Sequence, residues 1–195
     1  MQFFKKMSDA PSVTVISCTP AGWLESSHKM GEDMAAAVAD GSGYTVATPT
    51  DAAAFAEVWR RAHGTVIVHT HGSPTCLCNA ESADGKPGTP TIISAERIRL
   101  LRPNRAIHLV MITACQTAGG DAPDRCTAAC LSRKIAPDGI VIANKYTVWG
   151  GSTEFGSRQP DGWVIFRAGE VLPLPRVLTM ADALSLRRMY DRGNK

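Results

Sequence analysis

The sequence predicts a single α/β domain in which helices cover both faces of a mostly parallel, six-stranded sheet. Short apolar runs of strand length alternate along the chain with segments of helical periodicity. Two of these runs, residues 66–68 and 109–112, are continuously apolar, as expected of strands that are buried on both faces. With 195 residues, 44% hydrophobic and 20% charged, the chain has the size and composition of one globular domain.

The elements follow in order from local patterns. Strands are expected at residues 13–16, 44–47, 65–70, 107–113 and 140–143, followed by an edge hairpin of residues 163–166 and 171–174. Helices are expected at residues 51–62, 94–101 and 124–135, with another after the first strand and one near the C-terminus. Ser26 or Ser27 is a suitable cap for the helix after the first strand, and Thr179 and Asp182 form the capping box of the last. Residues 1–10 are expected to be a flexible N-terminus, and residues 73–91 a long active-site loop.

Charge and cysteine content exclude some classes of protein. The 21 basic and 18 acidic residues are mixed along the chain, so their net charge of +3 does not favour nucleic-acid binding. The N-terminus lacks the apolar run of a secretory signal, and no stretch has the length of a membrane span. A cytoplasmic location is therefore expected, and the six cysteines are not expected to form a disulfide framework.

Reactive side chains follow two of the expected central strands. The third strand ends in His69-Thr70-His71-Gly72-Ser73 and the fourth in Thr113-Ala114-Cys115-Gln116-Thr117. The carboxyl ends of parallel strands meet at one sheet edge, where ligands bind. A thiol nucleophile needs a proton-transfer partner, and histidine titrates in the useful range. The sequence therefore predicts a dyad of Cys115 and His71, with the backbone N–H groups of Gly72 and Cys115 as an oxyanion hole.

These residues carry a resemblance to a known family. A hydrophobic strand ending in His71-Gly72, followed 44 residues later by one ending in Ala114-Cys115, resembles the signature shared by caspases, gingipains, clostripain, legumain, separase and bacterial CHAT peptidases. The resemblance covers the third to fifth strands. It implies a caspase-like three-layer sandwich and a clan CD cysteine peptidase that acts through a thioester acyl-enzyme, without a metal or organic cofactor. His71 would then protonate the leaving amine and activate water for deacylation.

The local sequence departs from several branches of this family. Neither aspartate specificity nor specificity for basic residues is supported, because Thr113 stands two positions before Cys115 where the caspases have Gln and the clostripain-like enzymes have acidic residues nearby. The motif is closest to CHAT and clostripain-like domains. Ser73, Gln116 and Trp149 are expected to contact a peptide or protein substrate at this sheet end, although Trp149 is equally suited to packing under its own Gly-rich loop. The oligomeric state is left open.

Three other interpretations compete with a peptidase. His69 and His71 form a His-x-His pair, which could bind a metal with Asp121 or Glu25 in a metal-dependent hydrolase. A catalytically inactive, caspase-like interaction module is a second alternative, although His71, Gly72 and Cys115 are all intact. The third is a zinc site built from four other thiols, whose first pair is too closely spaced for most structural sites: Cys76, Cys78, Cys126 and Cys130. We interpret these four as incidental thiols, of which Cys76 and Cys78 could be redox-sensitive.

Overall fold

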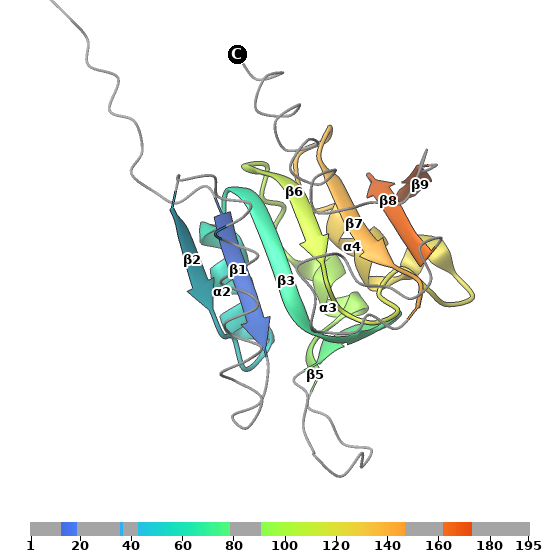
Figure 1. Ribbon diagram of the computed structural model, residues 1–195, viewed down its shortest axis with the longest axis horizontal. Coiled ribbons are helices and arrows are strands. Elements are labelled where there is room, and N and C mark those ends of the chain that lie inside the picture. Colours follow the sequence, from blue (N-terminus) through green and yellow to red (C-terminus); the bar gives the residue numbers. More distant parts are fainter. Residues whose placement is uncertain (1–12, 19–35, 37–42, 79–90, 147–161, 173–195) are drawn as a thin grey trace, which may run out of the picture.

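The protein is built around a large, mostly parallel β-sheet (Figure 1). The structure is a computed structural model that describes residues 13–18, 36, 43–78, 91–146 and 162–172. The main path of the sheet has the strand order β2-β1-β3-β6-β7-β8-β9. The strands are β1 (Val13–Cys18), β2 (Tyr44–Ala47), β3 (Gly64–Ser73), β6 (Ile107–Ile112), β7 (Ile140–Asn144), β8 (Trp163–Arg167) and β9 (Glu170–Leu172). Strands β2, β1, β3, β6 and β7 are parallel, whereas β8 and β9 are added antiparallel at one edge. The α/β class and the edge hairpin predicted from the sequence are confirmed.

The number of strands differs from the prediction, because the described residues form nine strands rather than six. Part of the predicted loop at residues 73–91 is strand: β3 continues to Ser73 and pairs antiparallel with β4 (Cys76–Cys78). Strand β4 pairs in turn with β5 (Thr91–Ser94). Residues 79–90 lie outside the described part of the chain, so only the two ends of the predicted loop can be placed.

Two of the described helices begin at polar side-chain caps. Helix α2 (Ala52–Arg61) is capped by Asp51, whose Oδ1 accepts the N–H groups of Ala53 and Ala54 at 2.8 Å. Helix α3 (Ala95–Leu100) begins at Ser94. The helix predicted at residues 124–135 is instead a short 3₁₀ turn, η1 (Pro123–Arg125), followed by α4 (Thr127–Ser132). The break occurs because Cys126 is extended, and this places the Thr127 N–H 2.8 Å from the carbonyl oxygen of Pro74.

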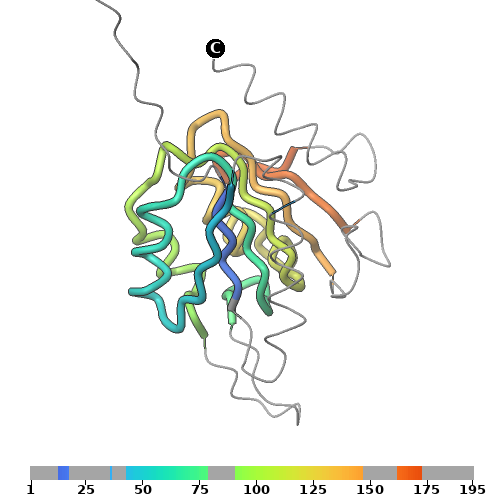
Figure 2. The backbone as a smooth tube through the Cα atoms, turned by 60° about the vertical axis from the view of Figure 1, so that its left-hand side comes forward, coloured from blue at the N-terminus to red at the C-terminus, as the bar shows by residue number. Residues whose placement is uncertain are grey.

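Both faces of the central strands are buried. On one face, alternate strand residues such as Val68 and Ile112 pack with the three described α-helices in a single core cluster, where Phe55 and Trp59 of α2 stack at 6.2 Å. Figure 2 shows α2 to one side of the strands. On the opposite face Ile67 and Met111 are also fully buried. Both central strands therefore belong to the interior, as their continuous apolar runs predict.

Several sequence-based expectations concern residues outside the described ranges. They include the helix capped by Ser26 or Ser27, the C-terminal helix that begins near Thr179, and the side chains of Glu25 and Trp149. Among the described helices, none combines the length and apolar character needed to cross a membrane.

Candidate active site

Strand β3 extends past its neighbours at the carboxyl end of the sheet. Its last pairing with β1 is between Thr70 and Cys18, and its last pairing with β6 joins Val68 to Ile112. Beyond this point β4 takes the place of β1, and His71 lies directly opposite Cys78. The predicted acid/base residue therefore stands on a short projecting ribbon, just above the ends of the two neighbouring parallel strands.

Gly72 joins this ribbon to the segment that contains Cys115. A Cβ atom placed on Gly72 would lie 2.6 Å from Cγ2 of Thr117, 2.9 Å from Cβ of Ala114 and 3.1 Å from the carbonyl oxygen of Cys115. Such distances are shorter than real Cβ contacts, so only glycine lets the two segments approach this closely. Gly72 is thus packed directly against the segment of Ala114, Cys115 and Thr117, which is far from it in the sequence.

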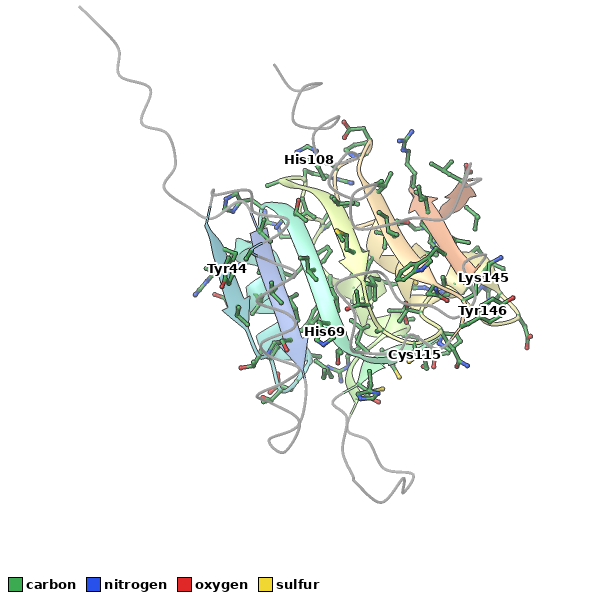
Figure 3. All side chains as sticks on the ribbon, viewed as in Figure 1. Tyr44, His69, His108, Cys115, Lys145 and Tyr146 are labelled. Carbon is green, nitrogen blue, oxygen red and sulfur yellow. The ribbon has the colours of Figure 1, made fainter. Side chains whose placement is uncertain are left out.

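Cys115 is followed at once by a tight turn. Gln116 has φ of 55°, in the left-handed region that side chains rarely adopt. Its N–H donates to the carbonyl oxygen of Tyr146 at 2.9 Å, and its own carbonyl oxygen accepts the N–H of Gly119 at 2.8 Å. The turn is therefore fixed to the chain that follows β7. Figure 3 shows Cys115 and His69 at the same end of the sheet, with His108 at the other.

The direction of the Gly72 peptide follows from strand geometry. The carbonyl oxygen of Val68 accepts the N–H of Thr113 at 2.9 Å, so the Val68 peptide faces β6. Successive residues of a strand present their backbone groups to opposite edges, and residues 68, 70 and 72 therefore face the same edge. The alternation directs the Gly72 backbone towards the Cys115 segment and that of His71 towards β4.

The two histidines of β3 differ in burial. His69 is buried, and its Nδ1 lies 2.8 Å from Oγ1 of Thr113. Burial lowers the pKa of His69, and the charge of nearby His71 lowers it further. The His71 side chain is largely exposed, and partial burial of its ring lowers its pKa as well. Both rings are therefore neutral at pH 7, and a neutral imidazole can accept a proton.

A row of polar residues crosses the sheet two residues before His71 on β3 and two residues before Cys115. The β1–β3 register pairs Ser17 with His69. When the β3–β6 and β6–β7 registers are continued past their last pairs, His69 is level with Thr113, and Thr113 is level with Asn144. Ser17 and Asn144 are fully buried, yet Oγ of Ser17 and Nδ2 of Asn144 have no hydrogen-bond partner among the described residues. Neither Ser17 nor Asn144 was expected from the sequence to belong to the site. Their signal was a polar residue at or next to the end of an otherwise apolar strand.

The other predicted site residues have varied positions. The hydroxyl of Ser73 accepts the N–H groups of Thr75 and Cys76 at 3.2 Å, so it shapes the β3–β4 turn. Gln116 is exposed beside Cys115, and Trp149 lies outside the described residues. In the described part of the chain, no group of three or more His, Cys, Asp or Glu side chains could hold a metal ion. His69 and His71 therefore have no third ligand there, and Asp121 does not complete a site with them.

The remaining described thiols do not converge. Cys76 and Cys78 lie side by side on β4, with their sulfur atoms 3.0 Å apart. Cys126 and Cys130 are buried at the start of α4, where the sulfur of Cys126 accepts the Ala129 N–H at 3.4 Å and the thiol of Cys130 donates to a backbone carbonyl oxygen. Each pair is thus engaged within its own element, which does not fit the four-sulfur zinc site weighed above.

Comparison with known proteins assigns no family to the chain. No protein-family model matches the sequence, and the search of curated proteins finds no match. The described arrangement offers a thiol at a tight turn, a neutral imidazole on the adjoining ribbon, and a glycine packed against the thiol's segment. These are the components of acyl transfer by a thiol nucleophile.

Proposed function

We propose that this protein is a cysteine endopeptidase of the caspase-like clan CD type, closest to CHAT and clostripain-like domains, with Cys115 as nucleophile and His71 as acid and base. The observation that carries the proposal is the contact of Gly72 with Ala114, Cys115 and Thr117. It brings the His-Gly and Ala-Cys motifs together across 44 residues of sequence. The mostly parallel sheet and the position of both motifs at its carboxyl end agree with the same interpretation.

The chemistry proceeds in two steps. Neutral His71 takes the thiol proton as the sulfur of Cys115 attacks the carbonyl carbon of the scissile peptide. It passes that proton to the departing amine as the C–N bond breaks, which leaves a thioester on Cys115 and His71 neutral again. Neutral His71 then removes a proton from a water molecule that attacks the thioester. The carboxylate product leaves and the thiol is restored. The lowered pKa of His71 suits it to the base role in this second step.

Charge develops on the substrate oxygen during both attacks. The backbone N–H groups of Gly72 and Cys115 are the proposed donors to that oxygen, and each such donor typically contributes about 3–4 kcal/mol to lowering the barrier. The alternation along β3 supports this role for Gly72, because it directs the Gly72 peptide towards the Cys115 segment. The exposed position of Gln116 supports its proposed contact with the substrate.

The proposal is tested by trapping the nucleophile. The purified chain is treated with a library of peptides that carry an acyloxymethyl ketone, and labelled residues are located by mass spectrometry. We expect label on Cys115 that is lost in Cys115→Ala and strongly slowed in His71→Ala. Cys76→Ala and His108→Gln are the matched controls, because they remove a thiol and an imidazole outside the proposed dyad.

Other outcomes would favour the competing functions. Hydrolytic activity that a chelator abolishes, with Cys115 unlabelled, would indicate a metal-dependent hydrolase. A chain that neither reacts with the trap nor cleaves any peptide of the library would be an interaction module. Labelling of Cys115 at the same rate with and without the His71 imidazole would contradict the dyad.

A further inference from the structure

The function proposed above does not use the two thiols of β4. Cys76 and Cys78 are two positions apart on one strand, so their side chains point to the same face. Their sulfur atoms are 3.0 Å apart, and the Cys76 sulfur also lies 3.2 Å from Oγ of Ser73. Both side chains are only partly buried, unlike Cys126 and Cys130. Reagents in solution can therefore reach this pair.

We propose that Cys76 and Cys78 are a modification site, at which a low-molecular-weight disulfide such as glutathione disulfide oxidises the two thiols to an intramolecular disulfide. Cys76 thiolate attacks one sulfur of the reagent, which forms a mixed disulfide and releases one glutathione thiolate. Cys78 then gives up its proton and attacks the Cys76 sulfur, which releases the second glutathione. Two electrons pass from the protein dithiol to the reagent, and two glutathione thiols are the products.

Local chemistry sets the order of these steps. Burial, together with the contact to Cys76, raises the pKa of the Cys78 thiol to about 12. Cys78 therefore remains protonated at neutral pH, and Cys76 reacts first because the thiolate is the attacking form. Once Cys76 carries the glutathione group, Cys78 is the nearest thiol to it. The second step is then intramolecular, which offsets the small thiolate fraction of Cys78.

The backbone geometry permits the bridge with a small movement. Residues two apart in an extended strand are about 6.6 Å apart between Cα atoms. This is near the upper end of the range of about 4.4–6.8 Å found in disulfides. The pairing of β4 with β5 is irregular between Leu77 and Cys78, and such irregularities bend a strand locally. Formation of the disulfide should therefore shorten the distance between the Cα atoms of Cys76 and Cys78 and bend β4 at Leu77.

That movement reaches the candidate active site. Cys78 is directly opposite His71 in the β3–β4 pairing, and Cys76 is opposite Ser73. A contraction of β4 changes the position of His71 relative to Cys115. We expect oxidation to slow peptide cleavage, and this consequence alone rests on the function proposed above.

The bridge itself is detected without any activity. The reduced 195-residue chain is incubated with glutathione disulfide, then blocked with iodoacetamide in denaturant so that buried thiols also react, and digested with trypsin. The six cysteines then fall in four peptides: residues 7–29 hold Cys18, residues 62–97 hold Cys76 and Cys78, residues 106–125 hold Cys115, and residues 126–133 hold Cys126 and Cys130. Residues 62–97 stay together because Lys86 precedes a proline and is not cleaved. We expect peptide 62–97 to be two hydrogen atoms lighter and unalkylated.

Two comparisons make this result decisive. In Cys78→Ser the same peptide should keep a glutathione group on Cys76, and peptide 126–133 is the internal control that should stay alkylated. If wild-type peptide 62–97 instead retains glutathione to the same extent as Cys78→Ser, or remains fully alkylated, the modification site is overturned.

Coupling to His71 is measured in the Cys115→Ala variant, so that no reaction at Cys115 contributes. Oxidation should shift the imidazole proton resonances of His71 and leave those of His108 unchanged, since His108 lies at the other end of the sheet (Figure 3). An unshifted His71 signal in the bridged protein would overturn the coupling. A chain that forms the bridge but cleaves no peptide even when reduced would refute the proposed function and leave the modification site standing.

Discussion

The two central segments, residues 64–73 and 107–117, change character between their amino and carboxyl halves. Over Val66–Val68 and Leu109–Ile112, β3 and β6 are paired, apolar and almost completely inaccessible to solvent. A few residues later His71 follows on β3, and Cys115 follows three residues after the end of β6. Stability therefore depends mainly on one half and the candidate chemistry on the other, so substitutions in the two halves should have separable effects.

The largest effect is expected from His71→Ala. Because general acid–base catalysis contributes a factor of about 10²–10⁴, kcat/KM for a cleaved peptide should fall by that factor. The melting temperature should change little, since the His71 side chain is largely exposed. Steady-state kinetics beside thermal unfolding measure both quantities. An equal loss of kcat/KM in His108→Gln would show that the effect is not local to the site.

The opposite behaviour is expected from Ile107→Ala. Ile107 is fully buried in the core cluster, at the end of β6 remote from Cys115. Replacing a buried Ile by Ala costs about 2–5 kcal/mol of unfolding free energy, through lost burial and the cavity that remains. Urea titration measures this loss, and kcat per folded molecule should stay unchanged. A large fall in kcat in the fully folded variant would contradict the separation of the two halves.

Gly72→Ala should affect stability and activity together, because Gly72 lies at the boundary of the two halves. The added methyl group would meet Cγ2 of Thr117 at 2.6 Å, and overpacking of this kind costs about 1–3 kcal/mol. Activity should also fall as the Cys115 segment is displaced. The double variant with Thr117→Ser, which removes Cγ2 but keeps a hydroxyl for the contact to the Ala114 carbonyl oxygen, should recover part of both losses. If neither stability nor activity recovers, the strain does not arise at Cγ2 of Thr117.

The smallest effect concerns pH. Burial lowers the pKa of His69 from its ordinary value of 6.5, so the unfolded chain binds this proton at higher pH than the native chain does. The contribution to stability is complete above pH 6.5 and is lost as the pH falls from 6.5 through the lowered native pKa, by at most about 1.4 kcal/mol per pH unit. Urea titrations at several pH values should show that the unfolding free energy of His69→Gln depends less steeply on pH than that of the wild type. The same dependence of unfolding free energy on pH in both proteins would contradict a buried neutral His69.

The central strands were predictable because their apolar runs are continuous. Strand β2 has the predicted bounds, and β1, β6 and β7 differ from prediction by at most two residues. Strand β4 was missed because Cys76–Cys78 is too short to show a period and is defined by its pairing with β3 and β5. The break at Cys126 likewise follows from a tertiary contact, the hydrogen bond between Thr127 and Pro74.

The sequence points to the candidate dyad because each member closely follows an apolar run, residues 66–68 or 109–112. The geometry around it could not be predicted. The register that aligns Ser17 with His69 is set by strand pairing, which no local pattern contains. The close approach at Gly72 was expected only as backbone access for a substrate, whereas the structure shows that it also admits Thr117 and Ala114.

The hydrogen bond between the Gln116 N–H and the Tyr146 carbonyl oxygen bears on biosynthesis. The turn after Cys115 is completed only by residues that are translated about thirty positions later, after β7 has been added to the sheet. A nascent chain that has emerged only as far as Cys115 lacks this support, even though both members of the candidate dyad have already been synthesised. We therefore expect the Cys115 thiol of a nascent chain to stay inactive towards neighbouring chains until β7 has joined the sheet and the turn after Cys115 is complete.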